Sequence, residues 1–285
     1  MSMPLPGAPT QSEKAERFRA LHRGAGAFII PNPWDRGTAR LLAHLGFEAL
    51  ATTSAGYAFS MGRPDNAVSR EAMLAHVSAI AATTPLPVSA DLEHGYGDSP
   101  TAVAETIRFA AGVGTVGGSI EDSTGRAEEP LYDIRQAAER IRAAAEAARK
   151  LPFPFTLTAR AENYLVGRPD LKDTLRRLQA YQEAGADVLY APGLASREDI
   201  AAVVSSVGRP VNVVMGLQGV RLGLTELSAL GVKRISVGSA LARAAFGAFL
   251  RAAEEMRAHG SFRFADGAAP YRDLNSLFRT LDGAP

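Results

Sequence analysis

Two carboxylates follow a short apolar run in 87-PVSADLEHGYGDSP, and they stand two residues apart. On an extended chain such side chains point to the same face, so Asp91 and Glu93 are predicted to aim at one spot. A third acid, Glu121, ends a later apolar run, 115-TVGGSIED. Crowded carboxylates repel one another unless a cation lies among them, and oxygen ligands suit Mg²⁺ or Mn²⁺. Together the acids predict a metal site, although a single acid in such a place is more often a helix cap or an ion-pair partner.

Arg160 ends another apolar run, 155-FTLTAR. Its planar guanidinium is suited to hold a carboxylate or a phosphonate through two parallel hydrogen bonds. Other catalytic groups are scarce. The chain has no cysteine, and no lysine lies at the end of an apolar run. His94, the histidine that follows the third run, is more typical of a loop or packing residue. These absences disfavour a thiol nucleophile, a Schiff-base aldolase and a Ser–His–Asp hydrolase. The chemistry that remains is a metal that polarises a 2-oxo acid and stabilises an enolate.

These residues would be positioned by a parallel barrel. Segments of helical period alternate with eight short apolar runs, several of them β-branched, as strands buried on both faces should be. This alternation predicts a (β/α)8 TIM barrel, with a doubly wound open sheet as the alternative. In a barrel the reacting groups lie at the C-terminal ends of the strands. The predicted strands are 27-AFIIP, 48-EALATT, 87-PVSAD, 115-TVGGSIED, 155-FTLTAR, 187-DVLYAP, 211-VNVVMG and 234-RISVGS.

A single barrel domain over residues 1–285, with a helical extension from about residue 238, is the simplest domain organisation. The extension contains a long helical pattern, 238-GSALARAAFGAFLRAAEEMRAHG, and a second one, 270-PYRDLNSLFRT. Such a C-terminal helix either caps its own barrel or packs on a neighbouring subunit. Long stretches without helical pattern, around 56–69 and 122–133, are more often functional than idle in a compact domain.

Composition narrows the function classes. The formal net charge of +1 gives no reason to expect binding to nucleic acid or to an anionic membrane. No segment approaches the roughly 20 apolar residues of a membrane span. The first residues, MSMPLPGAPTQSEKAERF, lack the apolar run of a signal peptide. We therefore expect a cytoplasmic protein that acts on small molecules.

Five segments resemble the isocitrate lyase and phosphoenolpyruvate mutase superfamily, and the resemblance runs from about Phe28 to the long C-terminal helix. It implies a barrel whose last helix is exchanged between subunits of a homotetramer, a dimer of helix-swapped dimers. It also implies Mg²⁺ and the cleavage or rearrangement of C–C or P–C bonds through an enolpyruvate-like intermediate. The segments are 31-PNPWDRGTARLLAHLGFEALATTSAG, 61-MGRPD, 90-ADLEHGYG, 119-SIED and 158-TARAENY.

The resemblance assigns expected roles by position. Asp91 and Glu93 match the metal-binding acids of the superfamily, and Asp65 and Glu121 match acids that bind the metal through water. The remaining matches are to residues that contact the substrate. We add Trp34, which either lines the pocket or fills the top of the barrel. The expected substrate-binding residues are Trp34, Ser54, Ala55, Gly56, Arg160 and Asn212.

The chain departs from the superfamily pattern in its gating loop. Isocitrate and methylisocitrate lyases carry a Lys–Arg–Cys–Gly–His segment there, with the cysteine as general acid, and phosphonopyruvate enzymes carry Lys and Asn. This chain has 123-STGRAEEPLYD instead, and the glutamate of strand six is replaced within 190-YAPG. Arg126 is the residue expected to close over a bound acid.

The resulting expectation is a Mg²⁺-dependent lyase that cleaves a C–C bond of a small 2-oxo or 2-hydroxy (di)carboxylate through an enolate. Arg160, Glu121 and Arg126 are its expected catalytic residues. One alternative is a mutase or hydrolase of the phosphonopyruvate or phosphoenolpyruvate type. Because the gating loop lacks the proton-donating residues of the superfamily, a further alternative is a non-catalytic protein that binds 2-oxo acids.

Overall fold

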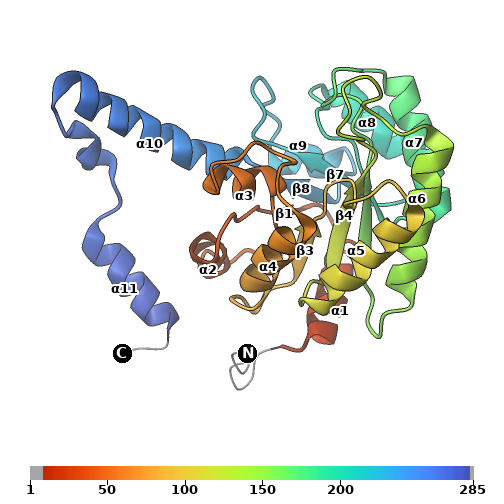
Figure 1. The fold of residues 1–285 in the computed structure, drawn as a ribbon, viewed down its shortest axis with the longest axis horizontal. Helices are drawn as coiled ribbons and strands as arrows, with labels where there is room; N and C mark the ends of the chain where they lie inside the picture. Colours follow the sequence, from red (N-terminus) through yellow and green to blue (C-terminus); the bar gives the residue numbers. More distant parts are fainter. Residues whose placement is uncertain (1–8, 283–285) are drawn as a thin grey trace. The chain divides into compact units, whose positions relative to one another are not determined.

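The computed structural model describes residues 9–282, which divide into two compact units at residue 239. Figure 1 shows both units along the chain. The first unit carries the strands and the candidate site. The second unit contains only helices, and the two are described separately.

The first unit is a parallel barrel, which confirms the prediction from the eight apolar runs. Seven neighbouring pairs are parallel, in the order β1-β8-β7-β6-β5-β4-β3-β2. The Ala51 amide donates to the Pro31 carbonyl at 3.1 Å, which links the two outer strands of this order. An open sheet is thereby excluded. The strands are β1 (Phe28–Ile30), β2 (Leu50–Ala51), β3 (Val88–Asp91), β4 (Gly117–Glu121), β5 (Thr156–Arg160), β6 (Val188–Tyr190), β7 (Val211–Val214) and β8 (Arg234–Ser236).

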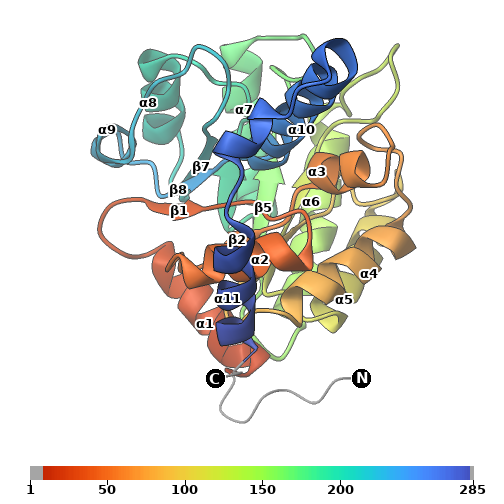
Figure 2. The same cartoon turned by 90° about the vertical axis from the view of Figure 1, so that its left-hand side faces the viewer.

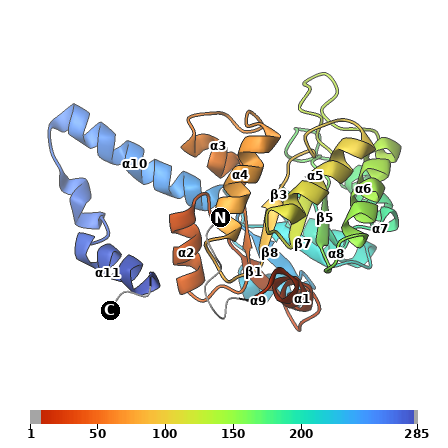
Figure 3. The same cartoon turned by 60° about the horizontal axis from the view of Figure 1, so that its bottom comes forward.

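Helices surround the strands, as Figures 2 and 3 show from two further directions. Ser69, Asp133 and Ser196 cap the helices that follow them, each accepting a hydrogen bond from a backbone amide of the first turn. The helices of this unit are α1 (Gln11–Leu21), α2 (Arg36–His44), α3 (Ser54–Ser60), α4 (Arg70–Ala81), α5 (Pro100–Gly112), α6 (Ile134–Arg149), α7 (Leu171–Ala184), α8 (Arg197–Ser206) and α9 (Leu224–Ala229).

The N-terminal end of the barrel is closed by α1. Phe18 of this helix is fully buried and lies edge-on to the rings of His22 and Phe28. A Cβ added at Gly117 would lie 2.8 Å from the Phe18 ring and 2.9 Å from the carbonyl oxygen of Thr156. The absence of a side chain at Gly117 is therefore what lets α1 approach the barrel.

The second unit consists of α10 (Ala240–His259), a 3₁₀ turn (Arg263–Gly267) and α11 (Tyr271–Leu281). Glu255 holds the turn, because its carboxylate accepts hydrogen bonds from the Ser261 hydroxyl at 2.6 Å and from two backbone amides. Ala242 is the one buried residue that the described part of this unit contains. Among residues 9–282, no helix is both long and apolar enough to cross a membrane. The exposed large apolar residues of the second unit are Leu241, Phe249, Leu250, Met256, Phe262, Phe264, Tyr271 and Leu274.

Candidate active site

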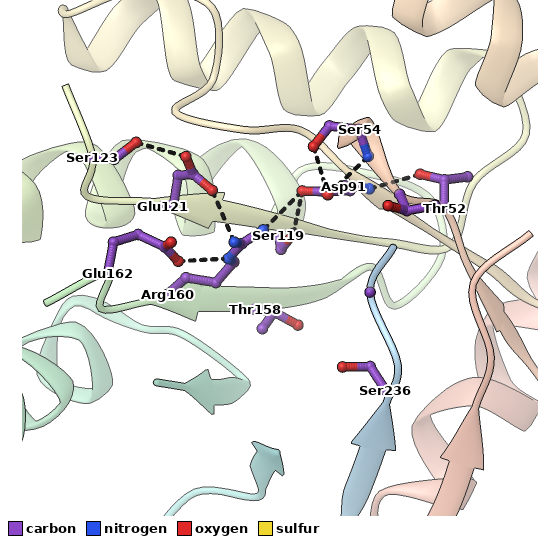
Figure 4. Close-up of polar contacts among 12 residues, drawn as sticks. Thr52, Ser54, Asp91, Ser119, Glu121, Ser123, Thr158, Arg160, Glu162 and Ser236 are labelled. Atoms are coloured by element: carbon purple, nitrogen blue, oxygen red, sulfur yellow. Dashed lines mark hydrogen bonds and ion pairs between the residues drawn. The ribbon is translucent and has the colours of Figure 1, made fainter. Parts of the chain in front are cut away.

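Arg160 is the centre of the candidate site, at the C-terminal end of β5 (Figure 4). Its Nη1 donates to Asp91 Oδ1 at 2.9 Å, its Nη2 lies 3.1 Å from Glu121 Oε2, and its Nε donates to Glu162 Oε1 at 2.8 Å. All four side chains are at most 16% exposed. Burial alone would lower the pKa of Arg160, but the surrounding carboxylates raise it well above its ordinary value. The guanidinium is therefore charged and held by three acids: Asp91 at the end of β3, Glu121 at the end of β4, and Glu162 two residues beyond β5.

Asp91 is oriented by the first turn of α3. Its Oδ2 accepts hydrogen bonds from the backbone amide and the hydroxyl of Ser54, both at 3.0 Å, and its own amide donates to Thr52 Oγ1 at 2.9 Å. Ala55 and Gly56 are the next residues of that turn. The predicted 54–56 segment thus lies beside the acids, with the Ser54 amide engaged by Asp91.

Glu93 reaches the site from a turn rather than from an extended strand. Its φ of 50° lies in the left-handed region, so the alternation rule that selected it does not describe its backbone. The side chain is 2% exposed and its Oε1 has no hydrogen-bond partner. Burial, and then the charges of Asp91, Glu121 and Asp65, raise the pKa of Glu93 to about 8. All four predicted acids are therefore close enough to act on one another.

Two of these acids have further contacts. Glu121 Oε1 accepts a hydrogen bond from the Ser123 hydroxyl at 2.6 Å, and burial raises the pKa of Glu121 although Arg160 opposes the shift. Asp65 lies in the exposed loop before α4, yet desolvation of its carboxyl and the charge of Asp91 raise its pKa. In both acids burial is the main cause of the raised pKa, and the charge of Asp91 adds to it.

The acids fit a hydrated Mg²⁺ better than an ion held by direct ligands alone. Within the part of the chain that the structure describes, no three acidic or histidine side chains come close enough to share an ion directly. Mg²⁺ commonly keeps several waters and takes only one or two carboxylates. The unpartnered, buried Oε1 of Glu93 is an acceptor suited to such an ion or its water. The donor set of Asp91, Glu93, Asp65 and Glu121 consists only of oxygens, which is the chemistry that Mg²⁺ requires.

Not every predicted substrate residue reaches the acids. Asn212 is 1% exposed inside the barrel, where its Oδ1 accepts from Arg234 Nε at 2.8 Å and its Nδ2 donates to Ser236 at 3.0 Å. Trp34 lies partly buried before α2, and its backbone amide donates to the Thr38 hydroxyl at 3.2 Å. Neither residue has a hydrogen bond to the four acids.

The gating loop is fastened to the turn that follows β3. Arg126 Nη1 lies 3.1 Å and 3.3 Å from the two carboxylate oxygens of Asp98, and the Tyr132 hydroxyl donates to the same carboxylate. Arg140 donates to the backbone carbonyls of Gly97 and Asp98, both at 2.6 Å. Arg126 thus pairs with Asp98, a residue that the sequence reasoning did not select.

Glu162 is a further charged residue of the site, and the sequence reasoning gave it no role. It is 3% exposed, and burial raises its pKa to about 8. Its position two residues after Arg160 is the same spacing that drew attention to Asp91 and Glu93, so the signal was present. His94 has a pKa lowered by burial, and its ring centroid lies 6.1 Å from that of Tyr96, which agrees with the packing role favoured for it.

Charged side chains gathered at the C-terminal ends of the strands of a parallel barrel lie where TIM-barrel enzymes have their active sites. The chain belongs to the phosphoenolpyruvate phosphomutase family, whose sequence model matches residues 18–257. Through this family it is a member of the isocitrate lyase and phosphoenolpyruvate mutase superfamily, as the sequence segments indicated.

Known proteins resemble the chain over most of its length. An uncharacterized protein of Mycobacterium tuberculosis is 34% identical over 267 residues, 91% of this chain and 95% of the relative. A Burkholderia cenocepacia protein provisionally described as a lyase/mutase is 66% identical, with a TM-score of 0.94, over 96% of this chain and 99% of that one. A 2,3-dimethylmalate lyase is 28% identical, with a TM-score of 0.82 over 93% of both chains.

A phosphonopyruvate hydrolase solved with oxalate and Mg²⁺ is 26% identical, with a TM-score of 0.83, over 96% of this chain and 95% of that one. The superfamily therefore includes lyases, mutases and hydrolases that act on small molecules, and one structural relative was solved with both magnesium and oxalate.

Proposed function

We propose that this protein is a Mg²⁺-dependent lyase that cleaves a C–C bond of a small 2-oxo or 2-hydroxy (di)carboxylate through an enolate. The observation that carries the proposal is the buried Arg160, held between Asp91, Glu121 and Glu162 at 2.8–3.1 Å. A guanidinium has parallel donors that can hold an organic carboxylate when its partners within the protein release them.

In this proposal the four acids would bind the metal and Arg160 would bind the substrate anion. Asp91 and Glu93 would hold Mg²⁺, with Asp65 and Glu121 contributing through water, and the ion would supply charge that polarises a 2-oxo group. Arg160 would bind the substrate carboxylate once its acidic partners turn toward the ion. Arg160, Asp91 and Glu121 are at most 16% exposed, and the limited access of water strengthens the interactions that they make.

The gating loop supports C–C cleavage over phosphonate chemistry, because it has no lysine or asparagine between residues 123 and 133. Its absent cysteine also separates this chain from lyases that take their proton from that loop. Arg126 would leave Asp98 and close over the bound acid. Among structural relatives, the 2,3-dimethylmalate lyase supports a substrate of the malate type.

The test is a panel of 2-oxo and 2-hydroxy acids with Mg²⁺, following release of pyruvate or glyoxylate alongside thermal stability. Asp91→Ala should abolish both turnover and stabilisation by Mg²⁺, while Glu139→Ala, which removes an exposed carboxylate of α6, should change neither. Metal-dependent turnover that persists in Asp91→Ala would reject the proposal. Stabilisation by an acid without turnover would favour the binding protein, and turnover of phosphonopyruvate alone would favour a mutase or hydrolase.

We also propose that the extension swaps between subunits of a cytoplasmic homotetramer and that residues 1–285 form one functional domain. The support is the exposed apolar surface of α10 and α11, of which Phe249 is 66% and Tyr271 85% exposed. Helices that bury so little alone are stabilised by packing on another chain. Light scattering should give the mass of four chains, and Phe249→Asp should lower it.

A further inference from the structure

A second pocket opens at the N-terminal ends of the strands, at the opposite end of the barrel from the candidate active site. This basal pocket has a volume of about 620 Å³, which is within the range of sites that hold small organic molecules. In TIM barrels this end normally serves stability, and the reaction takes place at the other end. A ligand bound here would therefore lie apart from the reacting groups. The pocket is formed by residues 19–23, 145–156, 185–188 and 209–210.

The rim of the basal pocket has more arginines than acids. Four arginines line the pocket, and Asp187 is the one acid among its described lining residues. Arg19 is already paired with Glu16 of α1, at 2.6 Å. Because Asp187 can offset only one more arginine, at least two positive charges of the rim are left without a counter-charge. Within residues 9–282, no hydrogen bond or ion pair is made by the side chains of Arg23, Arg149 and Arg209.

Arg149 and Arg209 reach the pocket from different elements, the end of α6 and the loop before β7. A Cβ added at Gly185 would collide with the Arg149 guanidinium, so this group lies against the backbone that leads into β6. Desolvation of its carboxyl raises the pKa of Asp187, and rim arginines, led by Arg209 and Arg149, oppose that shift. Asp187 Oδ2 accepts a hydrogen bond from the Leu157 amide at 2.8 Å. A single carboxylate, already bound to the backbone, thus faces several guanidinium groups.

A buried arginine adds positive charge behind the pocket. His22, which lines the pocket, is 6% exposed, and its Nδ1 donates to the Phe18 carbonyl oxygen at 2.8 Å. Its Nε2 lies 3.5 Å from Arg234 Nη1. Burial, followed by the charge of Arg234, lowers the pKa of His22 to about 3, so the ring is neutral. Arg234 is 5% exposed, and no carboxylate pairs with it among residues 9–282.

Other parts of the lining are apolar. Phe155 is 5% exposed, and the half-buried Phe153 lies two residues before it. Ala145 and Ala148 of α6 are buried and contribute small apolar surfaces. A planar ring of a ligand can pack on such a surface, and guanidinium groups also stack on aromatic faces. The basal pocket therefore combines an apolar lining with a cationic rim.

We propose that the basal pocket binds a nucleoside 5′-monophosphate, with the phosphate held by Arg149 and Arg209 and the base on the apolar lining. A phosphate monoester carries a charge of about −1.5 to −2 near neutral pH and has three acceptor oxygens. It therefore matches the two unbalanced charges of the rim better than a monocarboxylate does, and arginine binds it through two parallel hydrogen bonds. This inference does not rest on the proposed lyase function, because the pocket and Arg160 lie at opposite ends of the strands.

The test is calorimetric titration of the full-length protein with AMP, GMP, CMP and UMP. At least one of them should bind with a Kd below ~1 mM, and added salt should weaken that binding because the rim is exposed. Arg149→Gln and Arg209→Gln should each weaken it about tenfold or more, since each removes a charge-assisted hydrogen bond. Asp187→Asn keeps an acceptor for the Leu157 amide and removes a negative charge, so it should tighten binding. Arg142→Gln, which removes an exposed arginine of α6 outside the pocket, should bind as the wild type does.

The competing explanations give different results. Binding by none of the four nucleotides would refute the inference and leave the lyase proposal standing. Binding that is lost from Arg160→Gln and kept by Arg149→Gln would place the anion in the candidate active site instead. Inorganic phosphate or adenosine binding as tightly as the nucleotide would overturn the assignment of a two-part ligand, and malonate doing so would overturn the assignment of a phosphate. Light scattering should give Arg149→Gln the wild-type mass, and a lower mass would make this face a contact between subunits.

Discussion

Glu93 offers a quantitative test of the candidate site, through the substitution Glu93→Gln. Its pKa of about 8 in the fold, against an ordinary 4.5, follows from burial first and then from neighbouring carboxylates. That difference corresponds to about 5 kcal/mol of destabilisation when Glu93 is fully ionised. Because the pKa is raised in the folded state, the full stability is present below pH 4.5 and is lost as the pH rises through 8.

Glutamine keeps the shape of the side chain and removes the ionisation. The advantage of Glu93→Gln over the wild type should therefore grow by about 4 kcal/mol between pH 5 and pH 9, measured by urea unfolding in EDTA. Glu139→Gln removes the same charge from an exposed position, so its free energy of unfolding should change with pH as that of the wild type does. At pH 9, Mg²⁺ should stabilise the wild type by more than it stabilises Glu93→Gln, because the cation offsets the ionised carboxylate.

Two results would refute this reasoning. If the stability of Glu93→Gln and of the wild type changes with pH in parallel, Glu93 is not ionising against its surroundings. If Mg²⁺ stabilises both proteins equally at pH 9, Glu93 takes no part in holding the ion.

Three further expectations concern the barrel and its loop. Gly117→Ala should destabilise the fold by about 1–3 kcal/mol in urea unfolding, since a Cβ there meets backbone, whereas Gly112→Ala, with nothing within 4 Å, should leave stability equal or higher. Arg177→Met should cost about 3–5 kcal/mol, because Asp122, which accepts from Arg177 Nη1 at 2.9 Å, would remain buried and unpaired; a loss under 1 kcal/mol would contradict that pairing. Arg126→Ala should raise KM for the substrate acid, and an unchanged KM would reject its closure over the site.

The barrel could be predicted because each strand has a recognisable local sequence pattern. Apolar runs such as 211-VNVVMG are local signals, and the structure confirms a strand there, β7. The parallel order then follows from helices lying between strands. Asp91 and Glu121 were selected in the same way, because the strand ends of a barrel meet at one face.

The rest of the site depends on register and on turn geometry, which short sequence patterns do not encode. Asn212 was expected to contact substrate, yet its bonds to Arg234 and Ser236 depend on which residue of β7 pairs with β8. The approach of Glu93 depends on a left-handed backbone that an extended-strand argument cannot supply. Asp98 and Arg126 meet across 28 positions of sequence, between two loops without regular structure.

The fastening of the gating loop has a consequence for how an ion and an organic acid would bind. The segment from Asp91 to Asp98 carries two of the acids at one end and the partner of Arg126 at the other. Arg140 donates to three carbonyls of this segment, those of His94, Gly97 and Asp98, and so holds the Asp98 end to α6. Asp91 can therefore rearrange around an ion while Asp98 keeps its place. We expect metal binding and loop opening to be independent events.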